Sequence, residues 1–198
     1  DGVLAQGDTL TATVEGSQTD AGTSANRVAS YKVMRGDQDV TGSYSFGTPV
    51  DGTLGVTKRN VTLTSASAEQ VYNGQALRGD SVSVSGEGFV GNEGAKYTVT
   101  GSQTDVGSSA NEFSYELQNG AKADNYDITV VKGTLTVTPI ATPIIIAAKS
   151  AEKTYDAQAL TDSGYDYTQG VLVDGDVLSA TVEGSITDVG STANVIAG

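Results

Sequence analysis

Gly101-Ser-Gln-Thr-Asp-Val-Gly-Ser-Ser-Ala-Asn111 is a stretch that this chain of 198 residues uses three times. The other two versions begin at Gly16 and Gly184 and keep the Thr-Asp pair, the Gly after it and the closing Ala-Asn. Successive versions are about 85 and about 83 residues apart, which is the length of a small repeated module. The spacing therefore predicts an array of one module, and modules in tandem usually serve reach, multivalency or spacing.

Further matching pairs indicate where one copy of the module ends and the next begins. Val71-Tyr-Asn-Gly-Gln-Ala-Leu77 matches Thr154-Tyr-Asp-Ala-Gln-Ala-Leu160, and Thr53-Leu-Gly-Val-Thr57 matches Thr134-Leu-Thr-Val-Thr138. The sequence therefore predicts three parts. These are the C-terminal part of a copy in residues 1–58, a complete copy in residues 59–140 and the N-terminal part of another copy in residues 141–198.

Composition and periodicity indicate an all-β fold. Hydrophobic residues make up 37% of the chain and there are 25 glycines, which suits short strands joined by tight turns. Apolar and polar residues alternate in runs such as 134–138, and this period of two is typical of strands and argues against disorder. The sequence predicts an elongated array of small β-sheet modules. Within the complete copy we expect strands at residues 61–64, 80–84, 96–100, 112–117, 126–131 and 134–138.

The connections between these strands carry recognisable turn residues. Asn73-Gly74, Asn119-Gly120 and Lys132-Gly133 can supply the positive φ that short hairpin turns require. The stretches 88–92 and 170–174 leave open a single helical turn beneath the sheet. No longer window has helical periodicity.

Charge and residue types exclude several classes of function. The net charge is −13 and the pI is near 4.1, so most of the surface would repel a nucleic acid. The chain has no Cys, so no disulfide stabilises it and no thiolate takes part in chemistry. No apolar run is long enough to cross a bilayer and no signal peptide is visible, so we expect no membrane insertion of this stretch.

An ordered set of motifs gives a family resemblance. It consists of an opening at Tyr72-Asn-Gly74 and Tyr155-Asp-Ala157, a turn at Leu172-Val-Asp-Gly-Asp176, the repeated phrase, and a close that runs from Asn125-Tyr-Asp-Ile128 to Pro139. This set resembles the MBG and YDG repeats of large bacterial surface proteins, which are similar to modules of mucus-binding adhesins. The sequence departs from the family at Ala157, where a Gly is usual, and such a departure affects a turn.

The resemblance implies an extracellular, non-enzymatic stalk or adhesin repeat at a bacterial cell surface, which spaces or presents adhesive domains. It leaves a β-grasp-like module with one short helical turn as an alternative architecture. It implies no catalytic, cofactor-binding or metal-binding residue. The alternative function is a module that itself binds host mucin, a glycan or a host receptor. With no Trp, 9 Tyr and 3 Phe, the chain has few aromatic residues for that purpose.

Residue types also argue against catalysis and metal binding. His and Cys are both missing, although they are the commonest groups that exchange protons near neutral pH. Asp124-Asn125 with Asp127, and Asp174-Gly-Asp176, put oxygen ligands into loops, yet neither has the spacing of an EF-hand calcium loop. We therefore expect no enzyme activity, no cofactor and no metal site.

Arg35-Gly36-Asp37 is the one candidate for a receptor-binding site. Integrin ligands use this tripeptide, and here it falls in a predicted hairpin loop that corresponds to Asn119-Gly-Ala-Lys122. The loop of the next copy lacks the triplet, and a turn role for Gly36 is the alternative interpretation.

The partners that we expect are host mucus or a cell-surface glycoprotein, and neighbouring repeats of the same chain. A third partner is another molecule of this chain, because residues 1–58 and 141–198 each lack strands that the complete copy contains. Both parts should then expose unpaired strand edges. We expect these edges to pair, between molecules or after a shift of the module boundaries, since an incomplete sheet leaves backbone donors unsatisfied.

Overall fold

The computed structural model describes residues 3–197, and the regular structure in this range is almost entirely strand. Among these residues no α-helix occurs, and the helical elements are two short 3-10 turns, η1 (Thr41–Ser43) and η2 (Ala123–Asn125). The predicted all-β class is therefore confirmed. The helical turn that the sequence left open at residues 88–92 does not form. This stretch leads into a tight turn in which the Glu93 N–H donates to the Val90 carbonyl at 2.9 Å. The stretch 170–174 is not helical either.

By its internal contacts the chain divides into two compact units. Unit 1 contains the residues up to Ser65 together with Val82–Thr98 and Phe113–Val131. Unit 2 contains Ala66–Ser81, Val99–Glu112 and the residues from Lys132 onward. Each unit therefore combines segments that lie far apart in the sequence.

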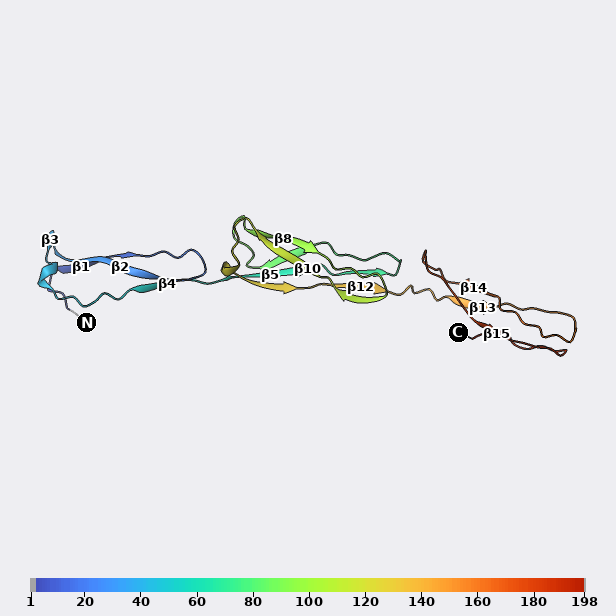
Figure 1. Ribbon diagram of the computed structural model, residues 1–198. Helices are drawn as coiled ribbons and strands as arrows, with labels where there is room; N and C mark the ends of the chain where they lie inside the picture. The colour runs from blue at the N-terminus through green and yellow to red at the C-terminus, as the bar shows by residue number, and fades with distance from the viewer. Residues whose placement is uncertain (1–2, 198) are drawn as a thin grey trace. The chain divides into compact units, whose positions relative to one another are not determined.

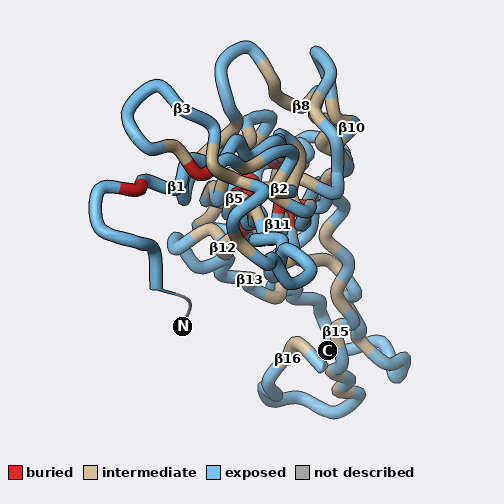
Figure 2. Tube along the Cα trace, turned by 90° about the vertical axis from the view of Figure 1, so that its left-hand side faces the viewer, coloured by how far each residue is buried: buried red, intermediate tan, exposed pale blue. Residues whose placement is uncertain are grey.

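The first sheet of unit 1 is built from strands that precede residue 58. β1 (Asp8–Glu15) and β2 (Gly22–Arg35) form a long antiparallel hairpin with an irregularity between Thr13 and Val14. Two shorter strands also pair with β2. β3 (Gln38–Asp39) pairs with the end of β2, and β4 (Gly52–Val56) pairs with the beginning of β2, as Figure 1 shows for β4. Most side chains of this sheet are exposed or half-buried, and Figure 2 shows how few of its residues are buried.

A hydrophobic cluster in unit 1 forms around the central strand of a second sheet. β5 (Arg59–Ser65) pairs in parallel with β11 (Tyr126–Val131) and antiparallel with β7 (Val82–Gly86). Alternate residues of β5 face inward, and the cluster consists of Val61, Leu63 and Tyr126 with partly buried neighbours that include Phe89, Tyr97 and Phe113. A separate pair of strands completes the unit, β8 (Gly94–Val99) and β10 (Phe113–Gln118).

Unit 2 repeats this plan around a different strand. β12 (Thr134–Thr138) lies between β6 (Ala68–Val71), with which it is parallel, and β9 (Gly107–Ala110), with which it is antiparallel. Its inward residues Leu135 and Val137 form a cluster with Leu77. The remaining strands form two small antiparallel pairs, β13 (Ile145–Ala148) with β14 (Tyr165–Gln169) and β15 (Val182–Glu183) with β16 (Val195–Ile196).

The six strands expected in residues 59–140 are all present, with ends that differ by a few residues. Two further strands, β6 and β9, were not predicted. Their sequences, Ala-Glu-Gln-Val and Gly-Ser-Ser-Ala, have few of the β-branched or aromatic residues that favour strands. They are strands because each pairs with an edge of β12.

The expected turns have mixed outcomes. Asn119 and Gly120 have φ of 58° and 87°, as a short hairpin turn requires. The hairpin expected at Lys132-Gly133 is wrong, because β11 pairs with β5 whereas β12 pairs with β6 and β9. Gly74 has a φ of 75°, and Ala157 occupies the matching turn with a φ of 58°, a conformation that costs free energy for any residue with a Cβ atom.

The closing Asn of the repeated phrase holds two backbone segments together. Asn111 Nδ2 donates to the carbonyls of Ala66 and Gly79, both at 2.8 Å. Asn194 repeats the arrangement with the carbonyls of Lys149 and Asp162, both at 2.9 Å. The opening Gly of the phrase lies directly against this Asn. A Cβ atom on Gly101 would lie 2.6 Å from Asn111 Cα and 2.7 Å from the Glu112 nitrogen.

Gly101→Ala is therefore expected to destabilise the protein, because the added methyl group meets backbone that cannot move aside. Overpacking of this kind costs about 1–3 kcal/mol, measurable as a fall in the free energy of unfolding in urea. Gly94→Ala is the matched control, since a Cβ there has nothing within 4 Å. Equal losses for the two variants would contradict the proposed role of the Gly101 and Asn111 contact.

Candidate functional site

A buried carboxylate anchors the start of β1. The Asp8 side chain is fully buried although that of Arg35 is 56% exposed. Arg35 Nε and Nη2 donate to Asp8 Oδ1 and Oδ2 at 2.6 and 3.0 Å, and the Tyr44 hydroxyl donates to Oδ2 at 2.5 Å. The hydrogen bonds from Arg35 and Tyr44 lower the pKa of Asp8. The carboxylate therefore stays ionised at neutral pH.

The same tyrosine contact occurs in the second sheet of unit 1. The Tyr44 oxygen accepts the Ala5 N–H at 2.9 Å, and the Tyr126 oxygen accepts the Val90 N–H at 3.1 Å. The Tyr126 hydroxyl donates to Glu93, as Tyr44 does to Asp8. Burial and then the bond to Glu93 raise the pKa of Tyr126. A backbone N–H, a tyrosine hydroxyl and a carboxylate thus form the same chain of hydrogen bonds twice.

A second contact joins the repeated phrase of residues 1–58 to residues that the sequence assigns to the predicted complete copy. Asn125 Nδ2 donates to Asp20 Oδ1 at 2.8 Å, and Asn125 Oδ1 accepts the Ala21 N–H at 2.8 Å. Lys122 Nζ donates to Asp20 Oδ2 at 2.6 Å. The bonds from Asn125 and Lys122 lower the pKa of Asp20. The loop that carries Asp20 is shaped by Gln18, whose Nε2 donates to the Asp20 carbonyl at 2.7 Å.

In unit 2, a third contact joins the predicted complete copy to residues 141–198. The Tyr72 hydroxyl donates to Asp176 Oδ1 at 3.2 Å, and this hydrogen bond raises the pKa of Tyr72. Gly74 lies beside Val173, because a Cβ added to Gly74 would be 2.9 Å from Val173 Cγ1. Asp8, Glu93 and Asp176 stand at the same place ahead of the repeated phrase. In all three cases the carboxylate at this position therefore accepts a hydrogen bond from a tyrosine hydroxyl.

Several carboxylates of the chain have lowered pKa values because they accept hydrogen bonds. The pKa of Asp39 is lowered by hydrogen bonds from Thr41, and that of Asp156 by a hydrogen bond from Lys153. Together with Asp8 and Asp20 these carboxylates are held in the charged form. A general acid at neutral pH needs the opposite, a pKa raised towards 7.

Arg35-Gly36-Asp37 lies where the sequence placed it, at the turn between β2 and β3. Met34 and Arg35 pair with Asp39 and Gln38, and Gly36 has a φ of 55°. Asp37 is exposed. The Arg35 guanidinium is already bound by Asp8, so a receptor that reads this tripeptide would compete with a buried carboxylate for it.

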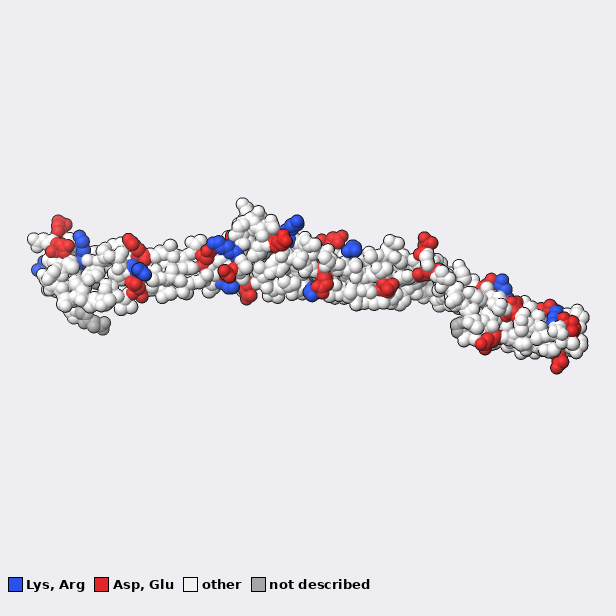
Figure 3. All heavy atoms as spheres, in the orientation of Figure 1, with Lys and Arg blue, Asp and Glu red and all other residues white. Residues whose placement is uncertain are grey.

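The acidic loops do not bring ligands together. Within residues 3–197 no three Asp, Glu, His or Cys side chains are grouped so that they could hold a metal ion. Asn125 is bonded to Asp20 and Ala21, and Asp176 accepts the Tyr72 hydroxyl. On the face shown in Figure 3, acidic and basic side chains are interspersed and neither forms a broad patch. Among the described residues no helix is long and apolar enough to span a membrane.

Apart from Arg35, which belongs to the candidate receptor-binding tripeptide, the sequence singled out none of the residues of these contacts as a site, although Tyr72, Asn125 and Asp176 belong to its motifs. One signal was available, namely that an acidic residue always precedes the phrase at the position of Asp8, Glu93 and Asp176. No sequence signal pairs Asp20 with Asn125, since more than a hundred residues separate them and the contact forms only on folding.

Tyr126→Phe removes the hydroxyl that links the Val90 N–H to Glu93. We expect the free energy of unfolding to fall by about 1 kcal/mol, the net contribution of a typical hydrogen bond. Tyr115→Phe is the control, because in the described residues no hydrogen bond of the Tyr115 hydroxyl is seen and its ring also packs on the cluster. If both variants lose the same stability in urea, the hydroxyl of Tyr126 has no special role.

Acid should destabilise the protein through Asp8 and Asp20. Their pKa values are lowered in the folded state, so their stabilisation is complete above the unfolded value of about 3.9. It is then lost as the pH falls through the lower folded values. Asp8→Asn should flatten the decline of the melting temperature below about pH 4, whereas Asp37→Asn in the exposed turn should leave it unchanged. An unaltered acid profile for Asp8→Asn would contradict this.

No family model, curated protein or solved structure matches the chain. The resemblance to MBG and YDG repeats therefore stays an expectation from the sequence.

Proposed function

We propose that the protein is a non-enzymatic tandem repeat of a bacterial surface adhesin, located outside the cell, that spaces or presents adhesive domains. The observation that carries the proposal is the recurrence of one set of contacts. In each case a backbone N–H donates to a tyrosine oxygen, and the tyrosine hydroxyl donates to a carboxylate. This arrangement is formed by Ala5, Tyr44 and Asp8, and again by Val90, Tyr126 and Glu93. The Asn111 contact recurs at Asn194. A module copied in series is expected to repeat its internal contacts in this way.

The contacts between successive copies support a spacer that resists bending. Asp20 binds Asn125 and Lys122, and Tyr72 binds Asp176. Each contact links residues of one predicted copy to residues of the next, so a hinge there must break charge-assisted hydrogen bonds. In the second joint Pro139 and Pro143 restrict the connecting backbone further.

The strand arrangement also suits a module under tension. β5 is followed in the chain by β6, and β11 is followed by β12. β5 pairs in parallel with β11, and β6 pairs in parallel with β12. Pulling on the start of β5 and on the end of β12 therefore shears these hydrogen bonds together instead of opening them one at a time. A spacer that holds an adhesive domain away from a cell would experience this load.

A second candidate function is that the module itself binds host mucin, a glycan or a host receptor. Tyr155 and Tyr167 favour it, because their side chains are 59% and 50% exposed and an exposed aromatic ring can stack on a sugar. Binding of the chain to immobilised mucin that Tyr155→Ala and Tyr167→Ala abolish would favour this candidate over the spacer.

The spacer is tested by inserting further copies of residues 59–140 after residue 140. The radius of gyration from small-angle X-ray scattering is expected to rise linearly with the number of copies. A compact protein would instead follow roughly the 0.38 power of its length. Proteins with one, two and three inserted copies distinguish the linear rise from the 0.38-power rise. A radius of gyration that follows the 0.38 power would overturn the proposal. A chain lengthened by a Gly/Ser linker of equal length is the control, since its dimensions rise only as roughly the square root of linker length.

A further inference from the structure

Asn73-Gly74 and Asn119-Gly120 are the two Asn-Gly pairs of the chain. In such a pair the Gly nitrogen can attack the Asn side-chain carbon Cγ, because a Gly has no Cβ atom to hinder the approach. The attack closes a succinimide ring and expels ammonia. Water then opens the ring at either carbonyl and leaves aspartate or isoaspartate. The backbone conformation of each pair decides how easily this reaction starts.

Asn119 is held in a conformation that prevents the attack. Its φ of 58° lies in the left-handed region, where ψ is about +47°. Such a ψ turns the Gly120 nitrogen to the side of the Asn119 Cα atom that is opposite to Cβ, so the nitrogen cannot reach Cγ. Asn119 Nδ2 also donates to the Asn92 carbonyl at 2.9 Å, and the Ala121 N–H closes the turn on the Gln118 carbonyl at 3.1 Å. The turn must open before Asn119 can react.

Asn73 lies in an exposed loop that favours the attack. Unlike Asn119, it does not have a positive φ. Asn73 Oδ1 accepts the Gln75 N–H at 2.9 Å, and Gln70 Nε2 lies 3.5 Å from the same oxygen. Negative charge develops on this oxygen when a nitrogen attacks Cγ, and N–H groups that point at it stabilise that charge. Among the described residues the Gly74 N–H donates to no acceptor, so the attacking nitrogen is not held back.

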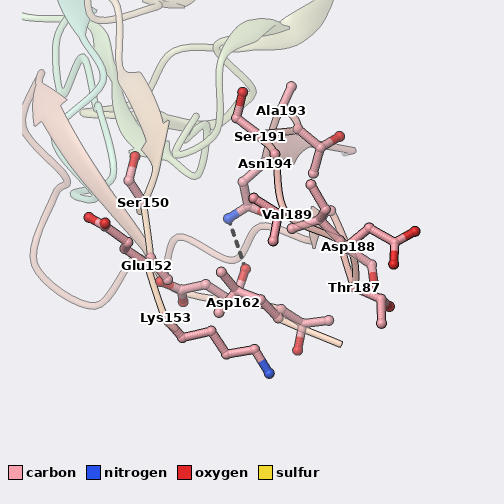
Figure 4. Close-up of a pocket in the computed structure, with 18 of the residues that line it drawn as sticks. Ser150, Glu152, Lys153, Asp162, Thr187, Asp188, Val189, Ser191, Ala193 and Asn194 are labelled. Atoms are coloured by element: carbon pink, nitrogen blue, oxygen red, sulfur yellow. Dashed lines mark hydrogen bonds between the residues drawn. The ribbon is translucent and has the colours of Figure 1, made fainter. Parts of the chain in front are cut away.

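The matching loop shows that a carboxylate fits at this position. Asp156 stands where the other loop has Asn73, and Asp156 Oδ1 accepts the Gln158 N–H at 3.0 Å. Lys153, whose extended side chain is seen in Figure 4, donates from Nζ to Asp156 Oδ1 at 2.7 Å. In the loop of Asn73, Gln70 takes the place of this lysine. A carboxylate formed there would not meet a lysine at the matching position.

We propose that Asn73 is a site of spontaneous deamidation, and that its conversion loosens the contact of Tyr72 and Gly74 with residues 173–176. The Gly74 nitrogen loses its proton to water and bonds to Asn73 Cγ. The bond from Cγ to Nδ2 breaks and ammonia leaves. Hydrolysis of the succinimide gives aspartate or isoaspartate at position 73. This inference concerns a chemical modification and does not rest on the spacer role.

Both products disturb the neighbouring contact. A Cβ atom on Gly74 would lie 2.9 Å from Val173 Cγ1, and the Tyr72 hydroxyl donates to Asp176 Oδ1. Isoaspartate inserts one extra backbone atom between Tyr72 and Gly74, so the two residues cannot both keep their positions. Each product also adds a negative charge next to Tyr72, on which Asp176 and Asp105 already act electrostatically. Charges of the same sign repel one another.

The first test compares the two Asn-Gly pairs within one protein. The whole chain is incubated in mildly alkaline buffer, folded in one sample and unfolded by urea in another. Peptide mass spectrometry then follows the replacement of NH₂ by OH at each Asn. In urea the rates at Asn73 and Asn119 should be similar, because Gly follows both. In the folded protein Asn73 should convert at least about tenfold faster, since Asn119 must first break two hydrogen bonds.

Equal rates at Asn73 and Asn119 in the folded protein would overturn the proposal. So would an Asn73 that stays intact in the folded protein while it converts in urea.

Hydrogen–deuterium exchange tests the effect on the contact. Residues 173–176 should exchange faster in aged wild-type protein than in fresh protein. Asn73→Gln is the matched control, because it keeps an amide but its attack would require a larger, less favourable ring. Aged and fresh samples of this variant should therefore exchange alike. Unchanged exchange in converted wild-type protein, or an equal increase in the variant, would overturn the loosening. Neither result depends on the scattering test of the spacer.

Discussion

A central strand with one parallel and one antiparallel neighbour closes each core of this protein, and the remaining contacts depend on it. β5 has this place in unit 1, between β11 and β7, and β12 has it in unit 2, between β6 and β9. Because both edges of each central strand are paired, its inward Val and Leu side chains are buried. Full burial of one such side chain contributes about 1.5–3 kcal/mol to stability. β4 is flanked on one edge within the described chain, and its apolar residues are correspondingly less buried.

These cores are small, so polar contacts have a large share in fixing the structure. The buried hydrophobic residues in the described range are Val33, Val61, Leu63, Leu77, Tyr126, Leu135 and Val137. Asn111 joins the segments that carry Ala66 and Gly79, and the buried Asp8 binds both Arg35 and Tyr44. Such groups are tolerated inside because each is hydrogen-bonded. A protein with an acidic surface and no disulfide can thus keep a definite fold.

The candidate site consists of these polar contacts, and each of them joins segments of the same chain. Carboxylates with lowered pKa values accept bonds from tyrosine, asparagine, lysine and arginine, so they hold segments in place at neutral pH. Sequence reasoning placed the Arg35-Gly36-Asp37 turn correctly but did not foresee that Asp8 binds its arginine. It also did not join Asp20 to Asn125. When the partner of a carboxylate lies far away in the sequence, no local pattern of residues indicates which residue that partner is.

By itself the sequence determined the strand class, the positions of the strands with alternating apolar residues and the turn at Asn119-Gly120. Alternation and a positive φ are local properties, so local residues are sufficient to specify them. Tertiary structure alone decided that β11 and β12 run parallel to β5 and β6, and that weak strand sequences at β6 and β9 become strands. Pairing partners are chosen by which buried faces fit together across long connections, and that choice leaves no periodic trace in the chain.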